Sequence, residues 1–294
     1  MAACVSPRAG TDHAAEPPRV EEEEEEEDFW TRRFTFGSLP PLCIQEHFGA
    51  GLGGTVWAGG VKLARYLVDD GGAQRLVDAF PQDVQDLHVL ELGAGCSGLP
   101  GLVMAQLRLF HSILVTDGDE EAVERLQLNF ENNVAATACS TRLQAQLLRW
   151  GDEADINAAS EFIKCSAVQQ QQQYHVIVGA DVAYRMTAAD PGAQAAVDAL
   201  CMTMRRLLAP DGVVILCQMA RPLYDETVLL SALMDEYAIT RLDEEQVVVT
   251  AAPPPSADDG GPGAEAVAAS VKERCGLGVL MLRRKAQTRP HDTI

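Results

Sequence analysis

The sequence predicts a doubly wound α/β fold: a seven-stranded sheet that is mostly parallel, with helices on both faces and an antiparallel last strand. Short apolar runs alternate along the chain with stretches in which apolar residues recur at helical spacing. Because parallel sheets arise from such alternation, this order indicates a helix-covered parallel sheet. Only a loop rich in Pro, Gly and Ala, residues 251–270, separates the last two runs, so we expect them to be antiparallel neighbours.

Each apolar run is interpreted as a strand, and the stretches between most of them as helices. The first helix, residues 54–70, is expected to end at Gly71 and Gly72. A polar stretch with a short glutamine run (169–173) is expected to form a loop. The remaining helices are predicted at 98–110, 120–133, 191–210 and 224–238, and the strands at 88–93, 112–117, 141–150, 174–181, 212–219, 243–250 and 275–284.

The composition disfavours several partners and sites. The 294-residue chain has 23 basic and 43 acidic residues, and its formal charge of −20 repels nucleic-acid phosphate and suits a basic substrate. No apolar run is long enough to cross a bilayer, which takes roughly 18 residues, so no membrane partner is expected. The eight cysteines and six histidines lack the spacing of a metal site. Scattered thiols predict a reducing compartment, the cytoplasm or alternatively the nucleus.

The N-terminal segment differs from the rest of the chain. It consists largely of Ala, Pro and charged residues and ends in an acidic run at 21–28. We expect residues 1–30 to form a disordered acidic tail, because such a run repels itself and buries little apolar surface. A docking arm for a basic partner is the alternative. Residues 31–294 are expected to form one domain, with the loop 251–270 inserted between its last two strands.

A glycine-rich turn follows the first predicted strand. The segment "GAGCSG" (93–98) fits GxGxxG and opens a helix, an arrangement that holds phosphate or carboxylate groups at a helix N-terminus. Asp117 ends the second strand, where a carboxylate can accept both hydroxyls of an adenosine ribose. These features admit two cofactors, a nicotinamide dinucleotide and S-adenosyl-L-methionine.

Glu91 distinguishes between these cofactors. It lies two positions before Gly93, where a carboxylate would repel the pyrophosphate of a dinucleotide. S-adenosyl-L-methionine instead brings an ammonium and a sulfonium group, both cationic. We therefore predict S-adenosyl-L-methionine as the cofactor, with Glu91 beside it. A nicotinamide-dependent oxidoreductase is further disfavoured because the sequence has no YxxxK motif.

Five segments, in order along the chain, resemble the family-16 lysine methyltransferases, which are seven-strand (class I) Rossmann-like enzymes. They are "GTVWAGGVKLARYL", "VLELGAGCSGLPG", "LVTDGDEEAVERLQLNFENN", "LLRWGD" and "VIVGADVAY", within roughly residues 45–285. The chain departs from the family pattern at "AGG" (58–60), which weakens the start of the predicted helix. The resemblance implies that the cofactor is contacted by Trp57, Gly93, Ala94, Gly95, Asp117, Trp150 and Ala180, with Trp150 flanking the adenine.

The segment "GADVAY" (179–184) follows the fourth predicted strand, at the edge where open α/β sheets bind ligands. Asp181 can accept a hydrogen bond from an amine, and Tyr184 can offer a π face or a hydroxyl to a cationic nitrogen. We predict that Asp181 orients a lysine amine and that Tyr184 shapes its channel. The alternative is that Asp181 caps a turn and Tyr184 packs in the core.

The sequence therefore predicts methyl transfer to a lysine side chain of a protein with a basic target site. Two alternatives keep the same cofactor. An arginine acceptor is one, because "GAGCSGLPG" also resembles an arginine-modifying branch of the family. A module that binds S-adenosyl-L-methionine without catalysis is the other.

Overall fold

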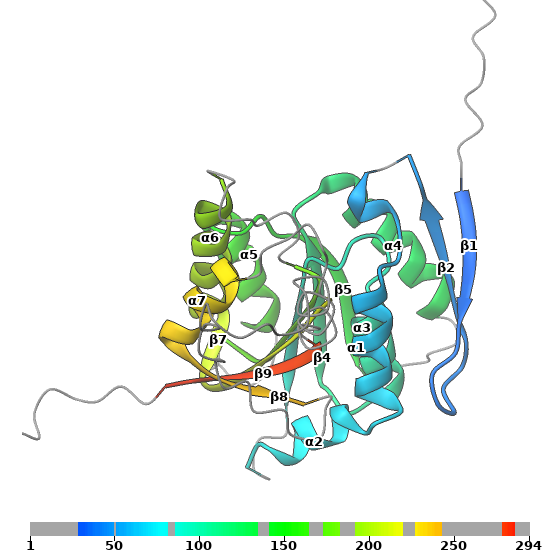
Figure 1. Ribbon diagram of the computed structural model, residues 1–294. Helices are drawn as coiled ribbons and strands as arrows, with labels where there is room; N and C mark the ends of the chain where they lie inside the picture. Colours follow the sequence, from blue (N-terminus) through cyan, green and yellow to red (C-terminus); the bar gives the residue numbers. More distant parts are fainter. Residues whose placement is uncertain are drawn as a thin grey trace, which may run out of the picture.

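The computed structural model has a central sheet with helices on both faces, and a two-stranded sheet beside this core (Figure 1). The predicted doubly wound α/β class is confirmed. The expected acidic run, most of the glutamine run, the strand at 243–250 and the loop 251–270 lie outside the residues that the structure describes. The structure describes residues 29–49, 51–81, 86–134, 141–164, 173–182, 192–219, 227–242 and 278–285.

The central sheet has seven strands within these described ranges, in the order β5-β4-β3-β6-β7-β9-β8. Neighbouring strands from β5 to β7 are parallel, whereas β9 runs antiparallel to both β7 and β8. The sheet is thus mostly parallel with a reversed last strand, as predicted. The strands are β3 (His88–Leu92), β4 (Ser112–Asp117), β5 (Arg142–Leu147), β6 (Tyr174–Ala180), β7 (Leu208–Gln218), β8 (Tyr237–Arg241) and β9 (Gly278–Arg284).

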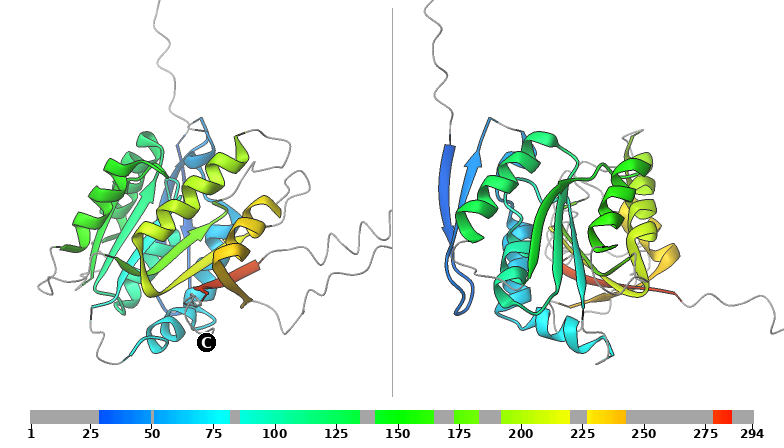
Figure 2. Two further views of the ribbon diagram at one scale, coloured as in Figure 1. Left: turned by 90° about the vertical axis from the view of Figure 1, so that its left-hand side faces the viewer. Right: turned by 180° about the vertical axis from the view of Figure 1, so that it is seen from behind.

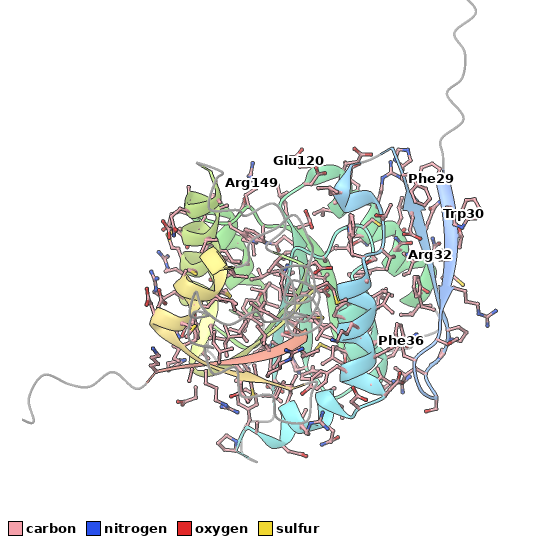
Figure 3. All side chains as sticks on the ribbon, in the orientation of Figure 1. Phe29, Trp30, Arg32, Phe36, Glu120 and Arg149 are labelled. Carbon is pink, nitrogen blue, oxygen red and sulfur yellow. The ribbon has the colours of Figure 1, made fainter. Side chains whose placement is uncertain are left out.

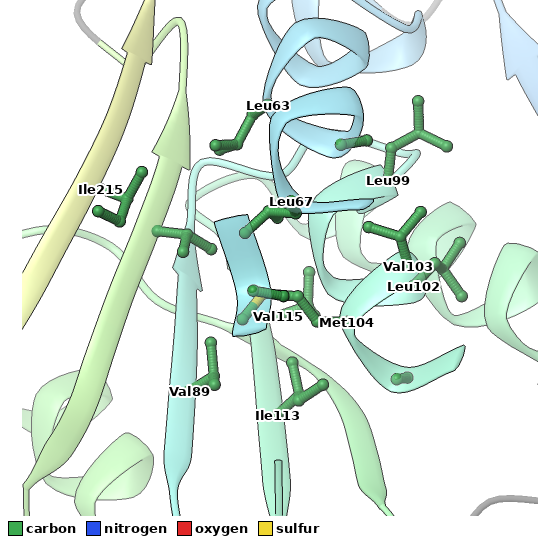
Figure 4. Packing of buried hydrophobic residues seen from close by; sticks show 14 of the residues in the cluster. Leu63, Leu67, Val89, Leu99, Leu102, Val103, Met104, Ile113, Val115 and Ile215 are labelled. Atoms are coloured by element: carbon green, nitrogen blue, oxygen red, sulfur yellow. The ribbon is translucent and has the colours of Figure 1, made fainter. Parts of the chain in front are cut away.

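Two layers of helices cover the sheet because successive residues of a buried strand face opposite sides (Figure 2). Val89 and Val115 point toward α1, α3 and α4, and Leu63 and Leu67 of α1 fill the same cluster (Figure 4). Leu90 and the other alternate residues face α5, α6 and α7. The helices are α1 (Ala58–Val68), α2 (Gly72–Asp78), α3 (Leu99–Leu107), α4 (Glu120–Val134), α5 (Glu153–Lys164), α6 (Ala193–Leu207) and α7 (Thr227–Glu236).

An N-terminal hairpin, β1 (Phe29–Phe34) and β2 (Leu42–His47), lies against α4 and has no counterpart in the sequence prediction. β1 includes the last two residues of the segment expected to be a tail. The side-chain amides of Asn129 and Asn133, one helical turn apart, bind the backbone N–H and C=O of Gln45 and Cys43 at 2.8–3.0 Å. These two amides occupy the place of a neighbouring strand, and they fix the hairpin to the core.

Two helices differ from the prediction. The predicted helix 54–70 is shorter: a 3₁₀ turn, η1 (Leu52–Gly54), comes first, and α1 begins only at Ala58 after Trp57. Gly71, in the left-handed conformation, allows the chain to turn and α2 to begin directly. α5 occupies part of the stretch predicted as a loop, which was wrong for residues 153–164. Its buried Ile156, Ala159, Phe162 and Ile163 have helical spacing that the surrounding polar residues obscure.

β8, at the edge of the sheet beside β9, begins within the predicted helix 224–238, and the strand predicted at 243–250 lies outside the described residues. The predicted helix 224–238 ends at Glu236 as α7, and Tyr237 and Ala238 belong to β8. Burial alternates along β8, with Tyr237 fully inside and Ala238 exposed, because one face of this edge strand packs on the core. β8 and β9 are antiparallel neighbours, whereas the predicted pairing of 243–250 with 275–284 falls partly outside the described residues.

Candidate functional site

A cavity of about 540 Å³ opens at the carboxyl ends of β3, β4 and β6, where doubly wound sheets bind ligands. Figure 3 shows Glu120, the first residue of α4, and Arg149, which lines the cavity, at the same end of the molecule. Every residue that the sequence assigned to cofactor contact lines this one cavity, and Asp181 lines it too: Trp57, Glu91, Gly93, Ala94, Gly95, Asp117, Trp150, Ala180 and Asp181.

The glycine turn forms the floor between β3 and α3. Gly93 and Gly95 have φ of +61° and +60°, the left-handed region that other residues adopt only with strain. A side chain at Gly95 would place its Cβ 3.0 Å from the carbonyl oxygen of Gly53 in η1. The amide of Ala94 donates to the Thr116 carbonyl at 3.0 Å, which joins the turn to β4. The turn therefore requires glycine, and it brings the backbone close to any ligand in the cavity.

Asp117 joins the turn to the end of β4. Its Oδ2 accepts a hydrogen bond from Gly95 at 2.8 Å, and its Oδ1 accepts one from Asp119 at 3.0 Å. Burial raises the pKa of Asp117, and the hydrogen bonds from Gly95 and Asp119 oppose this rise. Each carboxylate oxygen can accept a further bond, so the group remains able to accept a pair of hydroxyls.

Glu91, on the neighbouring strand β3, is buried, with only 2% of its surface exposed. Its Oε2 accepts a hydrogen bond from the Gly101 amide at 2.7 Å, across the close contact between β3 and α3. Burial raises the pKa of Glu91 to about 8, so its neutral acid form predominates at pH 7. A cation placed in the cavity would favour the ionised form. The preference of Glu91 for a cationic ligand, which the sequence predicted, therefore depends on pH.

Two tryptophans border the cavity from different elements. Trp57 immediately precedes α1, and its indole N–H donates to the Leu52 carbonyl at 2.7 Å while 39% of the residue stays exposed. Trp150 follows β5, and its ring lies 3.5 Å from the position that a Cβ on Gly93 would occupy. Both rings thus reach the cavity over the glycine turn.

Asp181 follows β6 and is buried in a left-handed conformation, with φ of +53°. Its Oδ1 accepts from the Met219 amide at 2.8 Å, after β7, and its Oδ2 accepts from the Gly59 amide at 3.2 Å, in the first turn of α1. The backbone amide of Asp181 donates to the carbonyl oxygen of Cys217 at 2.8 Å. The carboxylate therefore orients backbone from two other elements while it faces the cavity. Tyr184 lies outside the described residues.

Several lining residues were not identified from the sequence. The segment 51–55 passes over the glycine turn, and the Gly53 carbonyl accepts from the Cys96 amide at 2.7 Å. Asp119 caps α4 through Ala122 at 3.0 Å, and its place two residues after Asp117 was the available signal. The other such residues are Gly60, Ser97, Pro100, Gly118, Leu148, Arg149, Val182, Ala196 and Ala199.

Two further classes of site are absent from the part of the chain that the structure describes. No group of three or more His, Cys, Asp or Glu residues there could hold a metal ion. No helix among these residues is long and apolar enough to cross a membrane.

The strand order and the cavity at the carboxyl edge define a Rossmann-like α/β protein with a ligand site at the position typical of that fold. Residues 38–234 match the family described as lysine methyltransferase. The chain belongs to this family.

Individual relatives are more distant. The chain is 28% identical over 175 residues to protein-lysine N-methyltransferase EFM6 of Saccharomyces cerevisiae, over 57% of this chain. It spans 65% of the length of that relative. A predicted O-methyltransferase of Agrobacterium tumefaciens aligns over 72% of this chain and 80% of its own, with 15% identity and a TM-score of 0.39. A precorrin-6y C5,15-methyltransferase of Geobacter metallireducens aligns over 58% and 72%, with 15% identity and a TM-score of 0.34.

Adjacent glycines of α1 test the contact between Asp181 and this helix. A Cβ on Gly59 would lie 2.6 Å from Oδ2 of Asp181, whereas a Cβ on Gly60 meets nothing within 4 Å. Gly59→Ala should lower the free energy of unfolding by about 1–3 kcal/mol, because the carboxylate must move. Gly60→Ala, the matched control, should raise it by up to about 1 kcal/mol through helix propensity. Urea denaturation measures both, and equal effects of the two changes would contradict the contact.

Proposed function

We propose that this protein transfers a methyl group from S-adenosyl-L-methionine to a lysine side chain of a protein. The observation that carries the proposal is the family match, because it coincides with a single cavity that gathers the glycine turn, Asp117 and Glu91. The name of the yeast relative, a protein-lysine N-methyltransferase, supports the same acceptor. When bound, the cofactor supplies a methyl group on a cationic sulfonium, which is a strong electrophile.

The residues of the cavity fit this cofactor. Asp117 can accept the two ribose hydroxyls, since its oxygens are held by Gly95 and Asp119 in a fixed orientation. Trp150 offers a flat apolar ring for the adenine. Glu91 can neutralise a cationic group of the ligand by losing its proton.

The substrate amine, which accepts the methyl group, is expected at the end of β6, where Ala180 and Asp181 line the cavity. Methyl transfer needs the lone pair of a neutral amine in line with the methyl carbon, so the enzyme must position the amine and remove it from water. A desolvated channel lowers the pKa of a lysine ammonium and favours the neutral amine. The amides of Gly59 and Met219 donate to the Asp181 carboxylate and fix its direction, so it can orient that amine. Tyr184 remains the predicted channel residue.

The net charge of the protein bears on its kind of substrate, and its cysteines bear on its compartment. The net charge of −20 favours a protein substrate with a basic target site and disfavours nucleic acid. We assign the protein to the cytoplasm, with the nucleus as the alternative, from its scattered cysteines.

Incorporation of label from methyl-tritiated S-adenosyl-L-methionine tests the proposal. Purified protein incubated with a desalted cell lysate should label a protease-sensitive band that yields methyllysine on hydrolysis. Methylarginine would move the acceptor to arginine, and RNase-sensitive label would contradict a protein acceptor. The lysate should come from a strain that lacks this gene, so that the substrate is unmethylated. If the purified protein then binds the cofactor but labels nothing, the non-catalytic module is favoured.

Asp117→Ala should weaken binding of S-adenosyl-L-methionine by at least about tenfold, because hydrogen bonds to a charged group are lost. Isothermal titration calorimetry measures the dissociation constant. Asp78→Ala is the control, since Asp78 is exposed on α2, does not line the cavity and accepts a hydrogen bond from the side chain of Gln74 at 2.9 Å. An unchanged affinity in Asp117→Ala would remove the ribose assignment.

Affinity for S-adenosyl-L-methionine should rise with pH. Glu91, whose pKa is about 8, is mostly neutral at pH 6 and must release a proton to pair with the cation. Between pH 6 and 7.5 the dissociation constant should therefore fall roughly tenfold per pH unit. Glu91→Gln should bind with little dependence on pH. A flat profile in the wild-type protein would show that Glu91 does not pair with the ligand.

A further inference from the structure

A buried carboxylate outside the cavity, Glu46, connects the N-terminal hairpin to the site. Its side chain on β2 is 1% exposed. Arg32, labelled on the hairpin in Figure 3, lies on β1. It forms an ion pair with Glu46, and its Nη2 donates to Oε1 at 3.1 Å. Burying a carboxylate is costly unless it is paired and hydrogen-bonded, so the contacts of Glu46 should explain its presence.

The ion pair holds both polar backbone groups of one residue. The Val56 amide donates to Glu46 Oε1 at 2.5 Å, and the Val56 carbonyl accepts from Arg32 Nη2 at 3.1 Å. Val56 immediately precedes Trp57, which lines the cavity and lies just before α1. The hairpin therefore fixes the backbone at the point where the chain enters the cavity wall.

Trp57 needs such a restraint. Because 39% of the residue is exposed, packing alone restrains only part of it. Its indole N–H bonds to Leu52, five residues earlier in the same segment, and the Gly53 carbonyl attaches that segment to the Cys96 amide of the glycine turn. The contacts of Glu46 and Arg32 with Val56 attach the segment to a different element.

Glu46 also lies close to the glycine turn. Burial, together with the negative charge of Glu46, raises the pKa of the Cys96 thiol to about 12. Cys96 belongs to that turn, and its amide bonds to Gly53 of η1 at 2.7 Å. Glu46 thus sits where the hairpin, the segment leading to α1 and the glycine turn meet.

We propose that Glu46, supported by Arg32, is a positioning residue for the cofactor site: it holds Val56 so that Trp57 covers the cavity. It acts through Trp57 and does not touch the cofactor. The inference rests on the proposed function, because it concerns affinity for S-adenosyl-L-methionine.

Glu46→Gln tests this role. The carboxamide has nearly the same size, but it lacks the charge that pairs with Arg32 and strengthens the bond to Val56. The dissociation constant for S-adenosyl-L-methionine should rise about tenfold. The turnover number at saturating cofactor should change less than about twofold, since a residue that only positions the binding wall alters KM and leaves kcat. Amide hydrogen exchange at Val56 should also become faster.

Glu236→Gln is the matched control, because Glu236 of α7 pairs with Arg205 of α6 and neither residue lines the cavity. This variant should keep the wild-type dissociation constant. Arg32→Met provides a second variant if Glu46→Gln does not fold, since Arg32 is 44% exposed and the change leaves the Glu46 side chain itself in place. It should weaken binding in the same direction.

Wild-type affinity in a folded Glu46→Gln or Arg32→Met variant would overturn the inference alone. A fall in kcat with an unchanged KM for the cofactor would also overturn it. If the wild-type protein itself does not bind S-adenosyl-L-methionine, the proposed function fails and the inference fails with it, so the two failures are distinguishable.

Discussion

The hydrogen bond from a backbone amide to a buried or half-buried carboxylate is the interaction on which this site depends. Glu91 binds the start of α3, Asp117 binds the glycine turn, and Asp181 binds both α1 and the end of β7. Glu46, outside the cavity, binds the segment before α1. Where the carboxylate is ionised, such bonds are stronger than those between neutral groups, and they offset the cost of removing the charge from water. Side chains of one charge type thus assemble a cavity wall from elements far apart in the sequence.

The same groups give the cavity its electrostatic character. An acidic wall favours a cationic ligand, yet adjacent buried carboxylates also disfavour each other's ionisation. Burial is the main cause of the Glu91 pKa of about 8, and the charge of Asp117 adds to it, so Glu91 is largely neutral at pH 7 until a cation arrives. Asp117 is less buried and keeps two amide donors. In the empty cavity, neutral Glu91 therefore adds little repulsion between the acidic groups, and it can ionise when a positive group binds.

Local patterns were sufficient to predict the doubly wound sheet, the reversed last strand and the glycine turn with Glu91 and Asp117, because strand, turn and helix follow one another within a few residues there. Trp57, Trp150 and Ala180 were implied by the family resemblance, and the lining segment 51–55 was not identified. The hairpin could not be predicted in this way. Its attachment joins Gln45 to Asn129, 84 residues apart, and no periodicity records that pairing. The contact of Asp181 with Gly59 spans 122 residues, so the sequence indicated an amine-binding group and gave no sign of its backbone partners. α5 was missed because polar residues surround its apolar face.

A crystal structure of the protein with S-adenosylhomocysteine tests the central claim most directly. The account predicts that the ligand lies in the cavity over the glycine turn, with both ribose hydroxyls within hydrogen-bonding distance of Asp117 and the adenine against Trp150. A ligand bound elsewhere, or a ribose that does not contact Asp117, would contradict it.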